Sequence, residues 1–319
     1  MPGRQDNFSG DSVVFKREWP SILFVALFVS IMTAPFVFAG KDLLPDYWMI
    51  AHPWARMFEP TEPPARMTDP VYEFNPWFQF AQEMIKEGEF PHWNPYQCCG
   101  MPFYANRLVP IFYPPFLIAT LLSSPSRLLG WFQFMNLVIS GLGMYFLLRR
   151  WRISPSAASI SSCLFLTTTM NFIPYPVWTL GISGFPWLIW ALDGYLEKPK
   201  IMYIGIAGLI FGSMLIAGYP ILIVHLTYMT GMYFFARIWF FGAGRERWKP
   251  SYRWAVPILV MLAIFILGLG ISAVSNVPGI VMLQKSQREM GGFKNILYKE
   301  MTTSLEFIRQ AAKEVRNDI

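Results

Sequence analysis

Three aspartates lie in the long segment that follows the first apolar run of the chain: Asp42, Asp46 and Asp69. A positioned carboxylate can act as a general base and take the proton from a reacting hydroxyl group. Asp69 also has a structural alternative, because Asp69-Pro70 has the pattern of a helix N-cap followed by a proline at the first helical position. Of the three, Asp69 is the candidate catalytic carboxylate, and helix capping is its competing role.

Two further groups of ionisable residues carry weaker signals. Glu83, Glu87 and Glu89 flank Lys86, and we interpret them as the polar, water-facing side of a helix. His225 lies inside an apolar run, where an ionisable side chain is a functional candidate. A histidine that packs against a neighbouring helix is the alternative, so the sequence leaves the role of His225 open.

The composition places these residues in a membrane protein. Of the 319 residues, 54% are hydrophobic and 14% are charged, whereas a soluble domain has about 25% charged residues. The net charge of +6 comes from cations at the ends of apolar runs, which favours membrane topology over nucleic-acid binding. Neither a metal site nor a disulfide framework is indicated by the spacing of the three cysteines, Cys98, Cys99 and Cys163.

The chain contains several apolar runs that approach the roughly 20 residues needed to cross a bilayer. The first run, within residues 20–40, follows Lys16 and Arg17 and is predicted to be a membrane helix rather than a cleaved signal. The others are residues 128–148, 155–173, 178–196, 201–218, 220–241 and 254–275. The run 111–122 is shorter and contains two prolines, so we predict a juxtamembrane helix there.

The positions of the cations predict the orientation. With seven spans, Arg149, Arg150 and Arg152 fall on the same side as residues 1–19. Because cytoplasmic loops carry the excess of Lys and Arg, that side is predicted to be cytoplasmic. Residues 41–127 and 276–319 are then extracytoplasmic, and residues 128–275 hold six spans. The predicted fold is an all-α polytopic protein of the plasma membrane, with about seven transmembrane helices and a large helical first outer loop.

The outer loop, residues 41–127, is too rich in aromatic residues to be disordered. One helical face in it is formed by Val71, Phe74, Phe78, Ala81, Met84 and Ile85. Asn75-Pro76 repeats the cap-and-proline pattern, and Gly88 is predicted to close the helix in the C′ position. A second amphipathic helix is predicted in the tail, over residues 303–319, with no chemistry attached to it.

A series of motifs in chain order carries a resemblance to a known family. The motifs are Asp69, the pair Pro76-Trp77, G-E-F-P-H-W-N-P-Y at 88–96, G-M-P at 100–102, A-N at 105–106, G-Y-P at 218–220 and S-Q-R at 286–288. Together they resemble the YfhO-like membrane proteins of the GT-C superfamily, which are glycosyltransferases that use polyprenyl-phosphate sugars. Tyr219 stands where the family pattern has histidine, and family members usually run longer than this chain.

The resemblance implies a GT-C-like enzyme that moves a sugar from a polyprenyl-phosphate carrier to an acceptor hydroxyl at the outer face. It favours Asp69 as the base, with Asp46 and Asp42 next. For the cation that binds the lipid phosphate it favours Arg288 or Lys285, followed by Arg107 and Lys41. The remaining candidate substrate-binding residues are Trp93, Asn94, Tyr96 and His225. No metal ligand is predicted, although some enzymes of this superfamily use a divalent ion, and the sugar and the glycan, lipid or protein acceptor stay open.

Two other functions are compatible with the sequence. The chain could be a catalytically incomplete module or fragment that binds lipid phosphate and works with a partner subunit. It could also be a transporter of a lipid-linked substrate, a reading that paired broken spans in two similar halves would favour. The sequence shows no such internal repeat.

Overall fold

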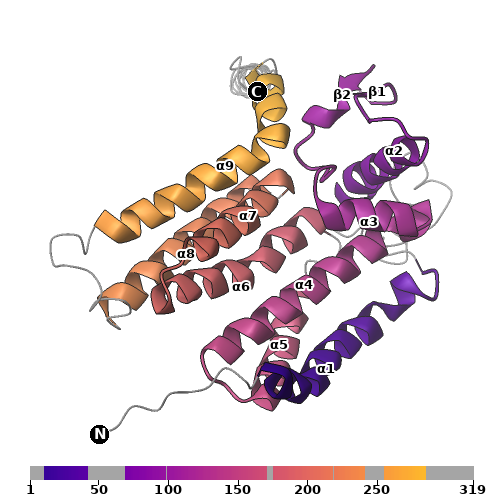
Figure 1. The fold of residues 1–319 in the computed structure, drawn as a ribbon. Helices are drawn as coiled ribbons and strands as arrows, with labels where there is room; N and C mark the ends of the chain where they lie inside the picture. The colour runs from indigo at the N-terminus through magenta and orange to yellow at the C-terminus, as the bar shows by residue number, and fades with distance from the viewer. Residues whose placement is uncertain are drawn as a thin grey trace, which may run out of the picture.

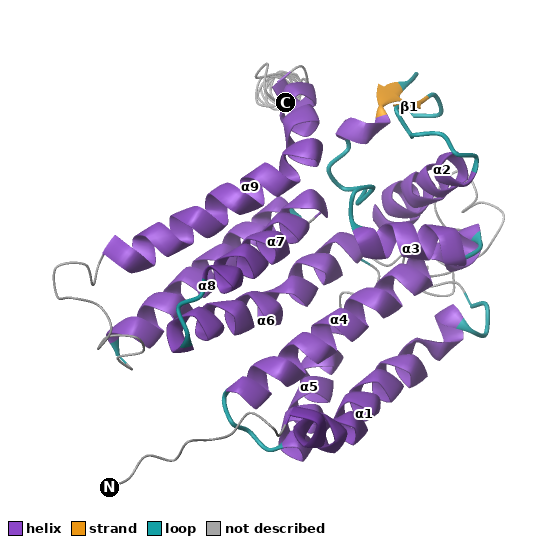
Figure 2. Cartoon of the chain, viewed as in Figure 1, coloured by secondary structure: helices purple, strands orange, loops and turns teal. Residues whose placement is uncertain are grey.

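The computed structural model describes residues 11–41, 69–97, 99–170, 175–217, 219–240 and 255–284, which are mainly helical (Figures 1 and 2). The α-helices are α1 Asp11–Val37, α2 Asn75–Lys86, α3 Pro114–Leu122, α4 Leu128–Arg150, α5 Pro155–Met170, α6 Pro176–Glu197, α7 Ile201–Ala217, α8 Pro220–Trp239 and α9 Ala255–Gln284. A π-helical turn at Pro70–Phe74, 3-10 turns at Phe103–Ala105 and Pro125–Arg127, and the two-residue strands β1 Trp93–Asn94 and β2 Met101–Pro102 complete the described elements.

Each apolar run predicted as a span folds as a helix. Four of the described helices are long and apolar enough to cross a membrane, and they are Glu18–Val37, Pro125–Arg150, Pro220–Trp239 and Ala255–Gln284. A shorter apolar helix covers Ile201–Ile216. Helix α9 continues past the predicted end at residue 275, and its 30 residues extend roughly 45 Å at 1.5 Å per residue. This length exceeds the hydrocarbon core of about 30 Å, so α9 is more than long enough to cross it.

The helices pack in a stepwise row (Figure 1). Helices α1 and α5 pack on α4, α4 packs on α6, α6 supports α7 and α8, and α9 packs on α7. The last pair is held close by glycines: a Cβ on Gly208 would lie 2.7 Å from the Cβ of Leu267, and one on Gly212 would lie 2.8 Å from the Cβ of Ile271. The G-x-x-x-G spacing at 208–212 therefore brings two helix backbones together, as small residues do in membranes.

The bundle has two distinct ends. The loop end holds α2, α3 and residues 88–113, next to the start of α4 (Figure 1). The arginine end holds the end of α4 and the end of α6, where Arg149 pairs with Glu18 at 2.6 Å and Arg150 pairs with Glu197 at 2.7 Å. Tyr145 also donates a hydrogen bond to the Glu18 carboxylate, so α1 and α4 are joined at the arginine end.

The loop end is folded onto the bundle through aromatic side chains. Phe78 of α2 contacts Phe116 of α3 and Phe132 of α4 edge to face, at ring-centroid distances of 5.0 and 5.7 Å. The buried Tyr113 hydroxyl donates to Asn136 of α4 at 3.0 Å. Burial raises the pKa of Tyr113 to about 12. The predicted juxtamembrane helix is present as α3, whose nine residues give a length of roughly 14 Å, too short to span a bilayer.

The sequence predicted the C-terminal end of α2 correctly and its N-terminal end incorrectly. Gly88 has φ +80°, and Gly88 N and Glu89 N donate to Ile85 O and Met84 O, so the predicted glycine cap is confirmed as a Schellman motif. The predicted cap at Asn75 is wrong, because the chain is already helical before it. Asn75 N donates to Pro70 O in a π-helical turn, and this wider turn accommodates Pro76, which has no N–H to donate.

Candidate functional site

The predicted catalytic carboxylates divide into described and undescribed residues. Asp69 lies within the described residues, whereas Asp42 and Asp46 lie outside them, as do the favoured cations Lys285 and Arg288. The predicted tail helix at 303–319 is outside them too. Among the described residues, the predicted site comprises Asp69 and the candidates Trp93, Asn94, Tyr96 and Arg107.

Asp69 is exposed and comes directly before the π-helical turn at Pro70–Phe74. Its side chain makes no capping hydrogen bond, so the predicted capping role of Asp69 is wrong, while its position before an N1 proline is confirmed. The pKa of Tyr175 is raised by burial and, secondly, by the negative charge of Asp69. The negative charge of Asp69 therefore acts on the Tyr175 phenol, and its carboxylate does not cap the π-helical turn.

A line of aromatic rings leads from this carboxylate to the start of α8. Phe74 lies 6.5 Å from Tyr175, Tyr175 lies 6.4 Å from Trp178, and Trp178 stacks on Tyr219 at 5.2 Å between ring centroids. We call these four side chains the aromatic row. Phe74 is buried in the core cluster of the loop end, and Tyr175, Trp178 and Tyr219 are partly buried against it.

A second feature is a hollow on the outer side of α2, which we call the α2 hollow. Its volume is about 380 Å³, within the range of roughly 300–1,000 Å³ typical of small-molecule sites, and its lining residues are Pro76, Trp77, Gln79, Phe80, Glu83, Asn94, Tyr96 and Gln97. The Trp77 indole N–H donates to the Gln97 side chain at 2.6 Å, which fixes one wall. Glu83, interpreted from sequence as a water-facing residue, adds a carboxylate to this wall.

The W-N-P-Y motif builds the opposite wall of the α2 hollow. The side-chain oxygen of Asn94 accepts a hydrogen bond from Tyr96 N at 2.9 Å, an Asx turn that holds the exposed Tyr96 ring at the rim. Trp93 pairs with Pro102 in the β1–β2 ladder, and its ring lies over Gly100, whose φ is +105°. A Cβ there would lie 2.6 Å from the ring, so Trp93 closes the turn rather than lining the hollow.

Arg107 lies against the C-terminal turns of α9. Its side-chain Cγ and Cδ sit where a Cβ on Gly279 would be, at 2.4 and 2.5 Å. Its Nε is buried and has no hydrogen-bond partner among the described residues, and burial lowers the pKa of this guanidinium. Leu108, the next residue, packs against the same core cluster as Tyr175 and Tyr219. Arg107 thus places a cation at the edge of the loop end, with donor capacity to spare.

The other two described candidates lie apart from these features. Lys41 is exposed just after the end of α1. His225 is exposed on α8, and its Nδ1 lies 2.6 Å from the Ile221 carbonyl oxygen of the same helix. The sequence alternative of a histidine bonded to a neighbouring helix is therefore wrong. Its ring faces outward, because the hydrogen bond to its own helix holds it on that face.

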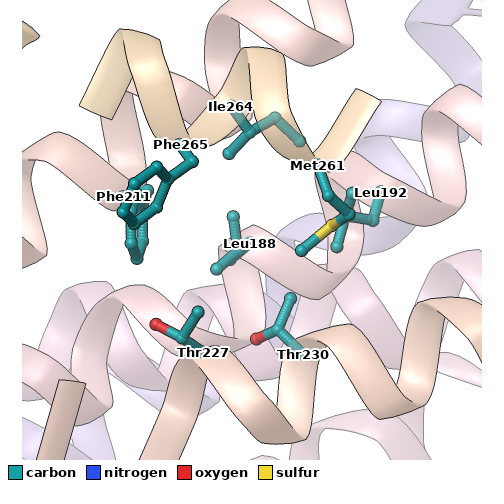
Figure 3. Close-up of a pocket in the computed structure, with 8 residues that line it drawn as sticks. All are labelled: Leu188, Leu192, Phe211, Thr227, Thr230, Met261, Ile264 and Phe265. Atoms are coloured by element: carbon teal, nitrogen blue, oxygen red, sulfur yellow. The ribbon is translucent and has the colours of Figure 1, made fainter. Parts of the chain in front are cut away.

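A small apolar hollow lies between α6, α7, α8 and α9 (Figure 3). Its volume is about 30 Å³, enough for roughly two water molecules. Thr227 and Thr230 donate their hydroxyl groups to the carbonyl oxygens of Ile223 and Leu226 in their own helix, so they offer no donor to a ligand. Within the described ranges there is also no group of three or more His, Cys, Asp or Glu side chains that could hold a metal ion.

No protein-family model, curated protein or solved structure matches this chain. The functional interpretation therefore depends on the geometry of the loop end and on the motifs that first indicated it.

Three residues of the site were missed in the sequence. Tyr175 and Trp178 sit one turn apart at the start of α6, a spacing that any apolar helix shows. Glu83 shares one face of α2 with Pro76 and Gln79, because residues three or four positions apart lie on the same side of a helix. The spacing could be read from the sequence, but only the fold brings the W-N-P-Y turn against this face of α2.

Proposed function

We propose that the chain is an integral membrane glycosyltransferase that transfers a sugar from a polyprenyl-phosphate carrier to an acceptor hydroxyl. In this proposal the seven long apolar runs all cross the plasma membrane, with the N-terminus in the cytoplasm and the loop end outside. The donor's isoprenoid tail stays in the bilayer, so its phosphate and sugar lie at the height of the loop end.

The observation that carries the proposal is the pairing of Asp69 with the aromatic row. The carboxylate is exposed and makes no capping hydrogen bond. Its charge raises the pKa of Tyr175, from which the rings continue to Tyr219. Tyr219 belongs to one of the motifs behind the family resemblance and Asp69 to another. In this proposal Asp69 supplies the base, and the partly buried rings of Tyr175, Trp178 and Tyr219 supply a surface for the sugar.

The chemistry assigns one role to each group. Asp69 takes the proton of the acceptor hydroxyl, whose oxygen forms the new bond to the anomeric carbon. The bond between that carbon and the phosphate oxygen breaks, and the electron pair leaves with the polyprenyl phosphate. Arg107 stabilises the negative charge on that phosphate. The α2 hollow, with Glu83, Asn94 and Tyr96 around it, is suited to hold part of the acceptor.

The experiment compares wild type with Asp69→Asn in lipid nanodiscs supplied with polyprenyl-phosphate sugars and crude envelope acceptor. The readout is release of free polyprenyl phosphate. Loss of a general base is expected to lower kcat by about 10²- to 10⁴-fold. Glu89→Gln is the matched control, since Glu89 is an exposed carboxylate of the same loop end and lies outside the α2 hollow. This control is expected to keep wild-type turnover.

Other outcomes separate the competing functions. Turnover retained in Asp69→Asn would remove Asp69 as the base and move the search to Asp46 and Asp42. Absence of turnover in wild type, with donor lipid still bound, would point instead to an incomplete module that needs a partner subunit. Movement of the labelled lipid across a vesicle membrane without sugar release would point to a transporter.

A further inference from the structure

The arginine end contains two adjoining hollows at the opposite side of the bundle from Asp69. One, of about 430 Å³, is lined by Arg150, Trp151, Arg152, Glu197, Tyr233 and Arg237. The other, of about 480 Å³, also borders Arg149, Trp190, Lys198 and Tyr203. Arg150, Arg152 and Glu197 belong to both. We call the first the arginine hollow, and the function proposed above makes no use of it.

A buried carboxylate holds the walls of the arginine hollow in place. Asp193 of α6 is fully buried, and it accepts hydrogen bonds from the Trp151 indole at 2.6 Å and from the Tyr233 hydroxyl at 2.6 Å. The Nε of Arg237 bonds to its other oxygen at 3.1 Å. One buried carboxylate thus fixes side chains from the end of α4 and from α8, and Arg237 compensates its charge.

Arg152 occupies a backbone position that favours glycine. Its φ is +63°, and its N–H donates to Arg149 O while Ile153 N donates to Leu148 O. This pattern is a Schellman motif with arginine in the C′ position, where glycine is the usual residue. Among the described residues no carboxylate forms an ion pair with Arg152. The strained position gives an exposed guanidinium at the edge of both hollows.

Among the described residues around the hollows, cations outnumber carboxylates. Four arginines and Lys198 surround them, and the neighbouring carboxylates are Glu197, Asp193 and Glu18. The Arg150 guanidinium also lies over the Trp190 ring, with its Cζ 4.5 Å from the ring centroid. Arginine forks of this kind match phosphate oxygens.

The arginine end also has the side chains of a membrane–water boundary. Trp19, Trp151 and Trp239 are each 41–52% exposed, and they lie at the ends of α1, α4 and α8, which are long apolar helices. Tryptophan collects where helices leave the hydrocarbon layer. The arginine hollow is therefore at the level of lipid headgroups, where basic pockets between helices bind anionic lipids.

We propose that the arginine hollow binds the phosphate group of an anionic membrane lipid, with Arg150, Arg152 and Arg237 as its donors. The acyl chains of that lipid remain in the bilayer beside α6 and α8. This site is separate from the proposed sugar-transfer site, and the two proposals stand or fall independently.

The test uses Arg152→Gly, because glycine favours the positive φ and the variant is expected to fold at least as well as wild type. Wild type and variant are purified in neutral detergent and titrated with phosphatidylglycerol, and retained lipid is counted by native mass spectrometry. Loss of one cation is expected to weaken retention about fivefold. Phosphatidylcholine and inorganic phosphate serve as separate probes, and neither is expected to displace the bound lipid at equal concentration.

Lys200→Gln is the matched control, since it removes an exposed cation of the same end that lines neither hollow. Retention equal to wild type in this control, together with the loss in Arg152→Gly, would support a built site. Equal weakening by both substitutions would overturn the proposal in favour of a general surface charge. Displacement of the lipid by inorganic phosphate would overturn the lipid as the ligand, and unchanged retention in Arg152→Gly would overturn the site.

Discussion

Gly279→Ala offers a way to move Arg107 without altering it. The new methyl group would lie 2.4 Å from Cγ and 2.5 Å from Cδ of Arg107, and 3.3 Å from the Ala105 carbonyl oxygen. Two carbon atoms do not approach so closely, so one of them must shift. The arginine side chain is the flexible partner, whereas the α9 backbone is held by its helix. We therefore expect Arg107 to swing away from the loop end.

The expected energies follow from this contact. Overpacking costs about 1–3 kcal/mol, and replacing glycine by alanine within a helix returns about 1 kcal/mol, so the protein loses at most roughly 2 kcal/mol of stability. If Arg107 binds the donor phosphate, its displacement removes a charge-assisted hydrogen bond worth about 1.5–3 kcal/mol. The KM for the polyprenyl-phosphate sugar should then rise about 10- to 100-fold. Gly279→Ala and Arg107→Gln should therefore raise the KM for the donor to a similar extent.

The assay measures the KM for the donor and the thermal midpoint for Gly279→Ala, Arg107→Gln and Gly270→Ala. Gly270 is on the same helix and has no atom within 4 Å of a new Cβ, so its substitution should keep the wild-type KM. A normal KM in Gly279→Ala together with a raised KM in Arg107→Gln would refute the reasoning that Gly279 positions the cation. A normal KM in both would remove Arg107 from phosphate binding.

Two further predictions concern the fold. Gly212→Ala should destabilise the α7–α9 contact by about 1–2 kcal/mol, because its Cβ would lie 2.8 Å from Ile271 Cβ and 3.2 Å from the Gly268 carbonyl oxygen. Gly205→Ala, which has open space at its Cβ, should leave the stability unchanged. Equal detergent-denaturation midpoints for the two variants would contradict this prediction. Tyr113→Phe should cost about 1 kcal/mol at neutral pH. Because burial raises the pKa of Tyr113 from 10.0 to about 12, the wild type should lose more stability than Tyr113→Phe as pH rises from 10 to 12. The difference in thermal midpoint should therefore narrow, and a constant difference would contradict this.

The helices of this protein were largely determined by its sequence. Apolar runs that have few charges and are flanked by cations must bury their backbone hydrogen bonds, and a helix does so within one segment. For the same local reason the glycine cap at Gly88 was predictable. The cap at Asn75 was wrongly predicted, because the cap-and-proline pattern does not reveal that the chain is already in a π-helical turn before Pro76.

Which functional side chains meet was decided only by the tertiary structure. The sequence favoured Asp69, Asn94, Tyr96 and Arg107 as single positions, and gave no distance between any of them and Tyr175 or Gly279. Those neighbours come from other helices, and their approach depends on how α6 and α9 pack against the loop end. Periodicity records which face of a helix is apolar, but it does not record which helix that face will meet. The aromatic row and the contact of Arg107 with α9 are consequences of that packing.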